Sequence, residues 1–390
     1  MTSPTTITPS RFIEPLDVLF LRGNQLFGEP GSYGEALMPP WPSVAAGALR
    51  TRLLADDGVD LAAFAAGQVV HPQLGTPAQP GPFVLQAFQL ARRQGTGIEL
   101  LMPLPADLVV TNTENATKND PAAPQAHHIT ALRPTALHSA MATSGPLLLV
   151  PVLAQTGRSK SASGWWLRSS GWRKYLQGQA ITPADLEHSS RLWSYDERIG
   201  IGLDNATRSA ADGKLFTARA VVLRAGVGFA VTVSGAALPE SGSLRLGGDG
   251  RAAQLHHAAM DWHALDHAAL TAITQARRCR IVLTSPGIFA EGWRLPGMDD
   301  AQRIHLPGLS ARVVAATVSR AETISGWNLA TWQPKPAKKA AGSGSVYWLD
   351  DLDTTPEALG KLVAHGLWAQ PCEDAQRRAE GFNRFSFATY

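Results

Sequence analysis

The hydrophobic pattern along the chain consists mostly of short apolar runs, which predict more strands than helices. Residues 12–21 are rich in Ile, Leu, Val and Phe and end at the turn signal Arg22-Gly23-Asn24, so they predict a first strand. Residues 218–223 and 228–233 are two further runs of this kind, and the four residues between them include a glycine. That spacing predicts a β-hairpin.

Helical spacing is clearest after Pro39-Pro40-Trp41-Pro42-Ser43, a segment that interrupts extended structure and offers Ser43 as a helix N-cap. Arg50 projects to a different face of this predicted helix from its apolar stripe. The stripe consists of Val44, Ala48, Leu49 and Leu53. Residues 262–277 and 356–367 predict two later helices.

Strands and helices mix throughout the chain without the regular alternation that a doubly wound parallel sheet requires. The pattern therefore predicts an α+β protein with two antiparallel sheets, each carrying helices on one face. A chain of 390 residues exceeds what one hydrophobic core usually serves. We expect two domains, comprising residues 1–260 and 261–390.

Composition narrows the function classes only partly. Thirty-five Lys and Arg against 32 Asp and Glu leave a net charge of +3, so any nucleic-acid site must be a local patch. Cys279 and Cys372 lack the spacing of a zinc or redox motif, which suits a reducing cytoplasm. Because no apolar stretch approaches 18 residues and the N-terminus lacks a leader-like pattern, we expect a cytoplasmic protein without a membrane partner.

A basic and aromatic segment stands out at residues 158–175. No acidic residue occurs between Asp120 and Asp185, whereas arginines and lysines alternate there with Trp165, Trp166, Trp172 and Tyr175. This composition is typical of segments that stack bases and neutralise phosphates. It equally fits an insertion that docks onto a protein partner.

Candidate catalytic groups have no supporting motif. The histidines that could serve as a general base, His71, His127, His128 and His138, have no nucleophile or partner pattern around them. His263 and His267 lie four residues apart on the predicted helix, but nothing nearby completes a metal site. We therefore predict no catalytic residue, no metal and no cofactor.

Short motifs distributed from end to end resemble a known family. They include Phe27-Gly28, Gly292-Trp293 and Ser325-Gly326-Trp327. The others are residues 15–23, 39–51, 199–204, 211–218, 246–251, 284–289, 334–336 and 344–348. Together they resemble the third subunits of the Cmr complex, the type III-B CRISPR effector of antiviral defence. These subunits belong to the repeat-associated mysterious protein (RAMP) superfamily and to its group that caps the guide-RNA 5′ handle.

This resemblance implies two ferredoxin-like (RRM-like) domains with large insertions and a projecting β-hairpin thumb. It implies a non-catalytic scaffold that binds the 5′ handle of the crRNA and bridges the large polymerase-like subunit to the backbone subunits, close to target RNA at the guide 5′ end. Family members often carry a Gly-rich loop near the C-terminus, whereas residues 381–385 here contain a single glycine.

Handle binding requires phosphate donors, pockets for splayed bases and close approach of the backbone. Gly-rich residues 247–251 allow such an approach, and Arg198 and Arg208 flank residues 200–204, so both could face one RNA strand. The residues we expect to bind RNA are Ser43, Arg50, Arg198, Asn205, Arg208, Lys214, Gly247, Gly248 and Arg251. Two alternatives are a RAMP-superfamily endoribonuclease that processes repeat RNA and a pure protein-interaction module.

Overall fold

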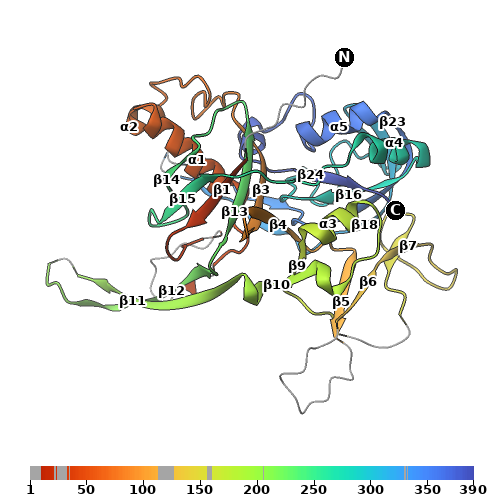
Figure 1. Ribbon diagram of the computed structural model, residues 1–390, viewed down its shortest axis with the longest axis horizontal. Coiled ribbons are helices and arrows are strands. Elements are labelled where there is room, and N and C mark those ends of the chain that lie inside the picture. Colours follow the sequence, from red (N-terminus) through yellow and green to blue (C-terminus); the bar gives the residue numbers. More distant parts are fainter. Residues whose placement is uncertain are drawn as a thin grey trace, which may run out of the picture.

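The computed structural model is a mixed α/β structure with mostly antiparallel sheets and few helices, as the hydrophobic pattern predicted (Figure 1). It describes residues 10–21, 23, 33–34, 36–112, 127–155, 160–204, 206–328, 331 and 333–390. The α-helices in this part of the chain are α1 (Pro42–Asp56), α2 (Leu61–Ala65), α3 (Ser169–Leu176), α4 (His267–Ala276), α5 (Pro356–His365) and α6 (Ala375–Ala379), and two short 3-10 helices span Pro183–Asp185 and Ser189–Arg191.

The larger of the two main sheets has eight strands. Their spatial order is β10 (Leu186–His188), β9 (Trp165–Arg168), β4 (Gly97–Pro103), β3 (Val84–Gln94), β13 (Val227–Ser234), β1 (Ser10–Pro15), β15 (Ala252–His257) and β14 (Ser241–Arg245). Helix α1 packs on one face, where its Leu49 and Leu53 share a buried core with Phe83 and Phe229. Apolar side chains at helical spacing thus meet apolar side chains that alternate along strands.

Helix α1 begins two residues earlier than the sequence predicted, which corrects the assignment of Ser43 as N-cap. Trp41 is the N-cap in extended conformation, and Pro42 is the first helical residue. Proline is favoured there because its missing N–H is one that the first turn leaves unpaired. Ser43 therefore lies inside the first turn.

The second main sheet has both faces covered. Its order is β17 (Arg303–Leu306), β18 (Leu309–Thr317), β23 (Val346–Thr354), β16 (Cys279–Leu283) and β24 (Phe385–Ala388). Ile281 of β16 joins a core with Ile273 of α4 and Leu362 of α5, whereas its neighbour Val282 joins a different core with Trp172 of α3. Successive strand residues point to opposite faces, so burial on both faces explains the continuous apolar runs.

A three-stranded sheet forms the long hairpin that projects from the body in Figure 1. It pairs β11 (Trp193–Leu203) with β12 (Ala210–Leu223), and β12 also pairs in parallel with β2 (Tyr33–Gly34). The hairpin predicted at residues 218–233 is therefore wrong, because residues 218–223 pair with β11 while β13 pairs with β1 and β3. We call β11, residues 204–209 and β12 the projecting hairpin.

Four two-stranded ladders complete the strands of the described residues. These are β5 (Leu108–Asn112) with β6 (His127–Ala131), β7 (Arg133–Thr135) with β8 (Val150–Val152), β19 (Glu322–Ile324) with β22 (Lys338–Ala340), and β20 (Trp327–Asn328) with β21 (Gln333–Pro334).

The basic and aromatic segment at residues 158–175 is largely a core element, which neither sequence interpretation anticipated. Trp166 and Leu167 of β9 are buried, and so are Trp172 and Tyr175 of α3. Its cations pair with acids distant in sequence: Arg168 with Glu99, Lys174 with Asp185, and Arg173 with Asp261. The three cations of β9 and α3 are thus paired by acids that the fold brings to them.

Side chains from both main sheets meet in one buried cluster around α3. At its edge Arg280 of β16 donates to Asp107 Oδ2 at 2.6 Å and to the carbonyl oxygen of Tyr175 at 3.1 Å. The Tyr175 hydroxyl donates to the other Asp107 oxygen at 2.9 Å. The division into domains at residue 260 stays a prediction, because this cluster joins strands from both sides of it.

Candidate nucleic-acid interface

Two predicted arginines from distant parts of the chain meet at the base of the projecting hairpin. Arg198 of β11 and Arg251, which precedes β15, lie on the ring of Phe20, with guanidinium carbons 6.0 and 5.0 Å from its centroid. Each already has an acidic neighbour: Arg198 Nε donates to Asp196 at 2.9 Å, and Arg251 Nη1 donates to Asp17 at 2.8 Å. Arg198 and Arg251 thus form a cationic surface around one aromatic ring, and we call these two residues the arginine pair.

Groups around the arginine pair lower the pKa of Asp17. The Val18 N–H donates to its carboxylate at 2.7 Å, and together with Arg251 and Arg198 this holds the pKa of Asp17 below its usual value. Asp17 is therefore ionised at neutral pH and compensates part of the charge of the arginine pair. An approaching phosphate would compete with it for Arg251.

Gly247 and Gly248 both lie against the backbone of Phe20. Gly247 has a φ of +76°, and a Cβ there would lie 2.9 Å from the carbonyl oxygen of Phe20. The Gly248 N–H donates to that same oxygen at 2.8 Å. The loop thus holds Phe20 in place through its backbone, and the Gly248 N–H is already engaged rather than free to bind a phosphate.

Other predicted residues lie further out along the projecting hairpin. Arg208 is exposed in the turn at its tip, where it adopts a φ of +55°, and Lys214 is exposed on β12 with its side chain over Gly202. Leu203, at the end of β11, is about 16 Å from Arg198 along the strand at the usual rise per residue. Arg198 and Arg208 therefore could contact one RNA strand only at separate positions. Asn205 lies outside the described residues.

Ser43 and Arg50 belong to α1 rather than to the hairpin. The Arg50 guanidinium carbon lies 5.2 Å from the centroid of the Phe83 ring, and the residue is half-buried. Burial lowers its pKa, an effect that Glu380 partly offsets. The structure thus brings together Arg198, Gly247, Gly248 and Arg251 but not these two residues.

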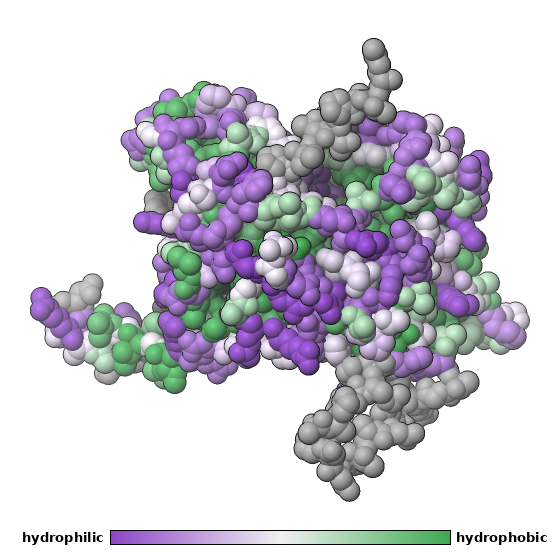
Figure 2. Space-filling view, in the orientation of Figure 1, coloured by the Kyte–Doolittle hydropathy of each residue, from purple (hydrophilic) through white to green (hydrophobic). Residues whose placement is uncertain are grey.

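One face of the projecting hairpin carries apolar side chains that the sequence interpretation missed. Ile199 is 75% exposed, and Ile201 and Leu203 are half exposed or more. Leu215 stands opposite Ile201 in the β-ladder, so both occupy this face. Figure 2 shows the apolar patch on this arm. The signal was present as alternation of apolar residues with Gly200 and Gly202, whose opposite face is covered by Phe216 and Lys214.

Two of the histidines considered as bases or ligands have local structural roles. His71 is buried, its Nε2 lies 2.8 Å from Asp57, and its Nδ1 accepts from Gln73 and Leu74. His263 precedes α4 and pairs with Asp261, so it does not share a helix with His267 as predicted.

No group of three or more metal-ligating side chains is found in the described ranges. In the same ranges, none of the helices is long and apolar enough to span a membrane.

Comparison with known proteins places this geometry in context. The model of the family CRISPR-associated protein (Cas_Cmr3) matches residues 11–386, and the chain therefore belongs to this family. The resemblance inferred from the distributed motifs is confirmed. No curated protein matches the chain.

Two solved structures resemble it at low identity. One is a chain of the type III-B Cmr-beta complex bound to cognate target RNA, with 14% identity, a TM-score of 0.46, and coverage of 87% of this chain and 86% of that one. The other is from the same complex bound to cognate target RNA and AMPPnP, with 13% identity, a TM-score of 0.46, and coverage of 90% and 88%.

Proposed function

We propose that this Cmr effector subunit binds the 5′ handle of the crRNA and bridges the large polymerase-like subunit to the backbone subunits. In this proposal the chain breaks no bond, works in the cytoplasm and lies close to target RNA at the guide 5′ end. Membership of the family supports a role within the effector complex. The choice of RNA as the ligand rests on the chemistry of the hairpin base.

The observation that carries the proposal is the arginine pair on Phe20. Two guanidinium groups held on one buried aromatic ring can contact successive phosphates, and this arrangement suits the backbone of single-stranded RNA. Both arginines are partly exposed, with side chains 44% and 27% accessible. Arg208 and Lys214 would extend the cationic path along the projecting hairpin, which in this proposal acts as the thumb.

The strand order supports a pair of ferredoxin-like units. In space, β24, β16, β23 and β18 have the order of the fourth, first, third and second strands of a β-α-β-β-α-β unit, with α5 between the third and fourth, and every neighbouring pair is antiparallel. In the larger sheet, β15, β1, β13 and β3 have the same order and directions, with α1 after the first strand.

The non-catalytic role is supported by the surroundings of His71, a buried histidine among the candidate general bases. Both of its ring nitrogens are engaged by Asp57 and by backbone N–H groups of its own loop. A general base must instead have one nitrogen within reach of a substrate proton. We therefore favour a scaffold over a repeat-processing endoribonuclease.

Reconstitution tests the proposal. The chain is mixed with crRNA and its neighbouring subunits, and the particle is examined for retained guide and for cleavage products on denaturing gels. We expect assembly without cleavage. Cutting of repeat RNA by the isolated chain, abolished by substituting the exposed His128 or His138, would instead establish the endoribonuclease.

Residue roles are tested with Arg198→Ala combined with Arg251→Ala. Each phosphate contact on a single strand contributes about 0.7 to the slope of log affinity against log salt, so losing two should reduce that slope by about 1.4. Arg312→Ala is the matched control, because it removes a partly exposed arginine from the other main sheet. An unchanged slope in the double variant would rule out the arginine pair as the RNA contact.

A further inference from the structure

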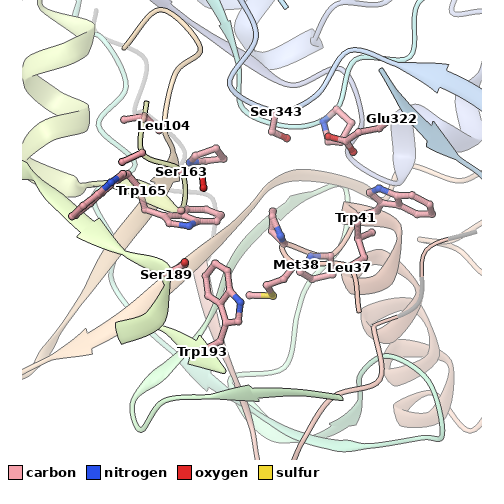
Figure 3. Close-up of a pocket in the computed structure, with 17 residues that line it drawn as sticks. Leu37, Met38, Trp41, Leu104, Ser163, Trp165, Ser189, Trp193, Glu322 and Ser343 are labelled. Carbon is pink, nitrogen blue, oxygen red and sulfur yellow. The ribbon is translucent and has the colours of Figure 1, made fainter. Parts of the chain in front are cut away.

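A cavity of about 410 Å³ lies between the two main sheets, beside the hairpin base but separate from the arginine pair. Figure 3 shows Trp165 and Trp193 on one side of this cavity, with Glu322 and Ser343 across it. Its size falls within the range of small-molecule pockets, about 300–1,000 Å³. The backbone links it to the candidate interface, because the N–H of Leu37 in its wall donates to Leu21, the neighbour of Phe20.

The walls of the cavity suit a flat ring. Trp166 and Trp193 are fixed against each other edge to face, with ring centroids 5.7 Å apart. Both are buried, so their rings are held rigidly, while Trp165 and Met38 are half-buried and present apolar surface to the space. Aromatic platforms of this kind stack nucleobases regardless of sequence.

The single charged residue among the described lining residues is Glu322, at the start of β19. Its carboxylate makes no ion pair and no regular hydrogen bond within the described residues, although the Trp41 indole N–H approaches it without regular geometry. Burial raises the pKa of Glu322, and Trp41 partly offsets this rise. A half-buried carboxylate approached by a single N–H keeps acceptor sites that a ligand donor can satisfy.

No lysine or arginine is found among these lining residues, so the cavity itself does not fit a phosphate. It fits an uncharged ring that brings a hydrogen-bond donor. Exocyclic amino groups of nucleobases are such donors, and glutamate accepts from the N4 amino group of cytosine. Uracil presents a carbonyl oxygen at the same position, which a carboxylate repels.

We propose that this cavity binds one unpaired nucleobase with an exocyclic amino group, stacked on the tryptophans and hydrogen-bonded to Glu322. The inference rests on the proposed function, because the base belongs to single-stranded RNA held at the neighbouring arginine pair. It adds base selectivity to a site whose arginines contact only the backbone.

Cytosine and uracil octanucleotides test the inference, because their bases have nearly the same shape and differ at the position facing Glu322. Binding of labelled rC8 and rU8 to the full chain is measured by fluorescence anisotropy. We expect about tenfold tighter binding of rC8, the size of one charge-assisted hydrogen bond. Ultraviolet crosslinking should join rC8 to a peptide that contains Trp165 or Trp193.

Two variants act on the cavity independently. Glu322→Ala removes the acceptor, and Ser163→Phe fills the space from an exposed position without changing Glu322. Both should abolish the preference for rC8. Glu291→Ala, which removes an exposed glutamate that does not line the cavity, should keep it.

Equal affinity of the native chain for rC8 and rU8, or a preference that survives in both variants, would overturn the inference. If salt-dependent binding of both octamers persists in that case, the proposed RNA-binding function still stands. Binding of neither octamer at low salt would overturn both.

Discussion

The buried contact between Asp107 and Arg280 gives a quantitative test of how the two main sheets are held together. Asp107 is fully buried and Arg280 is 7% exposed. Arg280 Nη1 donates to Asp107 at 2.6 Å, and its Nη2 donates to the carbonyl oxygens of Tyr175 and Thr389 at 3.1 and 2.8 Å. Its guanidinium carbon also lies 4.3 Å from the centroid of the Tyr175 ring.

Replacing Arg280 with Met leaves a carboxylate buried without its cation and removes the donor to the Thr389 carbonyl oxygen, whereas the Tyr175 carbonyl oxygen still accepts from the Gly178 N–H. Breaking a buried ion pair on one side costs about 3–5 kcal/mol of unfolding free energy. The second substitution Asp107→Asn removes the orphaned charge and keeps an acceptor for the Tyr175 hydroxyl. The double variant should therefore recover a large part of the loss, because neutralising both partners avoids the desolvation penalty.

Urea unfolding followed by tryptophan fluorescence measures both variants, since Trp172 and Trp348 are buried in the adjoining cluster. Arg312→Met is the control: its side chain and that of its partner Asp351 are both partly exposed, so its loss should cost less than about 1 kcal/mol. The reasoning is refuted if Arg280→Met is no more destabilising than this control, or if the double variant is as unstable as the single one.

Two further outcomes follow from local geometry. Burial raises the pKa of Asp185, but hydrogen bonds from Lys174, Thr182 and Ser170 outweigh this and lower it from 3.8 to about 2. The lowered pKa stabilises the folded state by about 2 kcal/mol above pH 4, and this stabilisation is lost as the pH falls through 2. The difference in unfolding free energy between the native chain and Asp185→Asn should therefore shrink over that pH range. Gly247→Ala places a Cβ against the carbonyl oxygen of Phe20 at a positive φ, so it should lower the free energy of unfolding by about 1–2 kcal/mol and weaken RNA binding. Denaturation measures the first effect and fluorescence anisotropy the second. Unchanged values would contradict the packing described.

Local sequence signals identified the elements better than their partners. The helical spacing after Pro42 predicted the start of α1 to within two residues, because proline and an apolar stripe act locally. The pairing of residues 218–223 was wrong because strand partners are chosen by the whole sheet, and a short turn cannot reveal that β12 continues to Ala210.

In the candidate site too, the sequence identified residues better than the contacts between them. Arg198 and Arg251 were identified from motifs and charge, but their meeting on Phe20 depends on three segments far apart in the chain. The burial of much of residues 158–175 could not be predicted for a related reason. The acids that pair with its cations, Glu99 and Asp261 among them, belong to other elements.

The turn that joins β12 to β13 has a mechanical consequence. Only residues 224–226 separate the projecting hairpin from a central strand of the eight-stranded sheet. This turn is anchored on both sides: the Arg224 N–H donates to Leu192 at 2.9 Å, and the Arg93 N–H donates to Gly226 at 2.8 Å. A load applied to the hairpin tip is therefore transmitted as shear into the middle of the protein instead of being absorbed by a hinge.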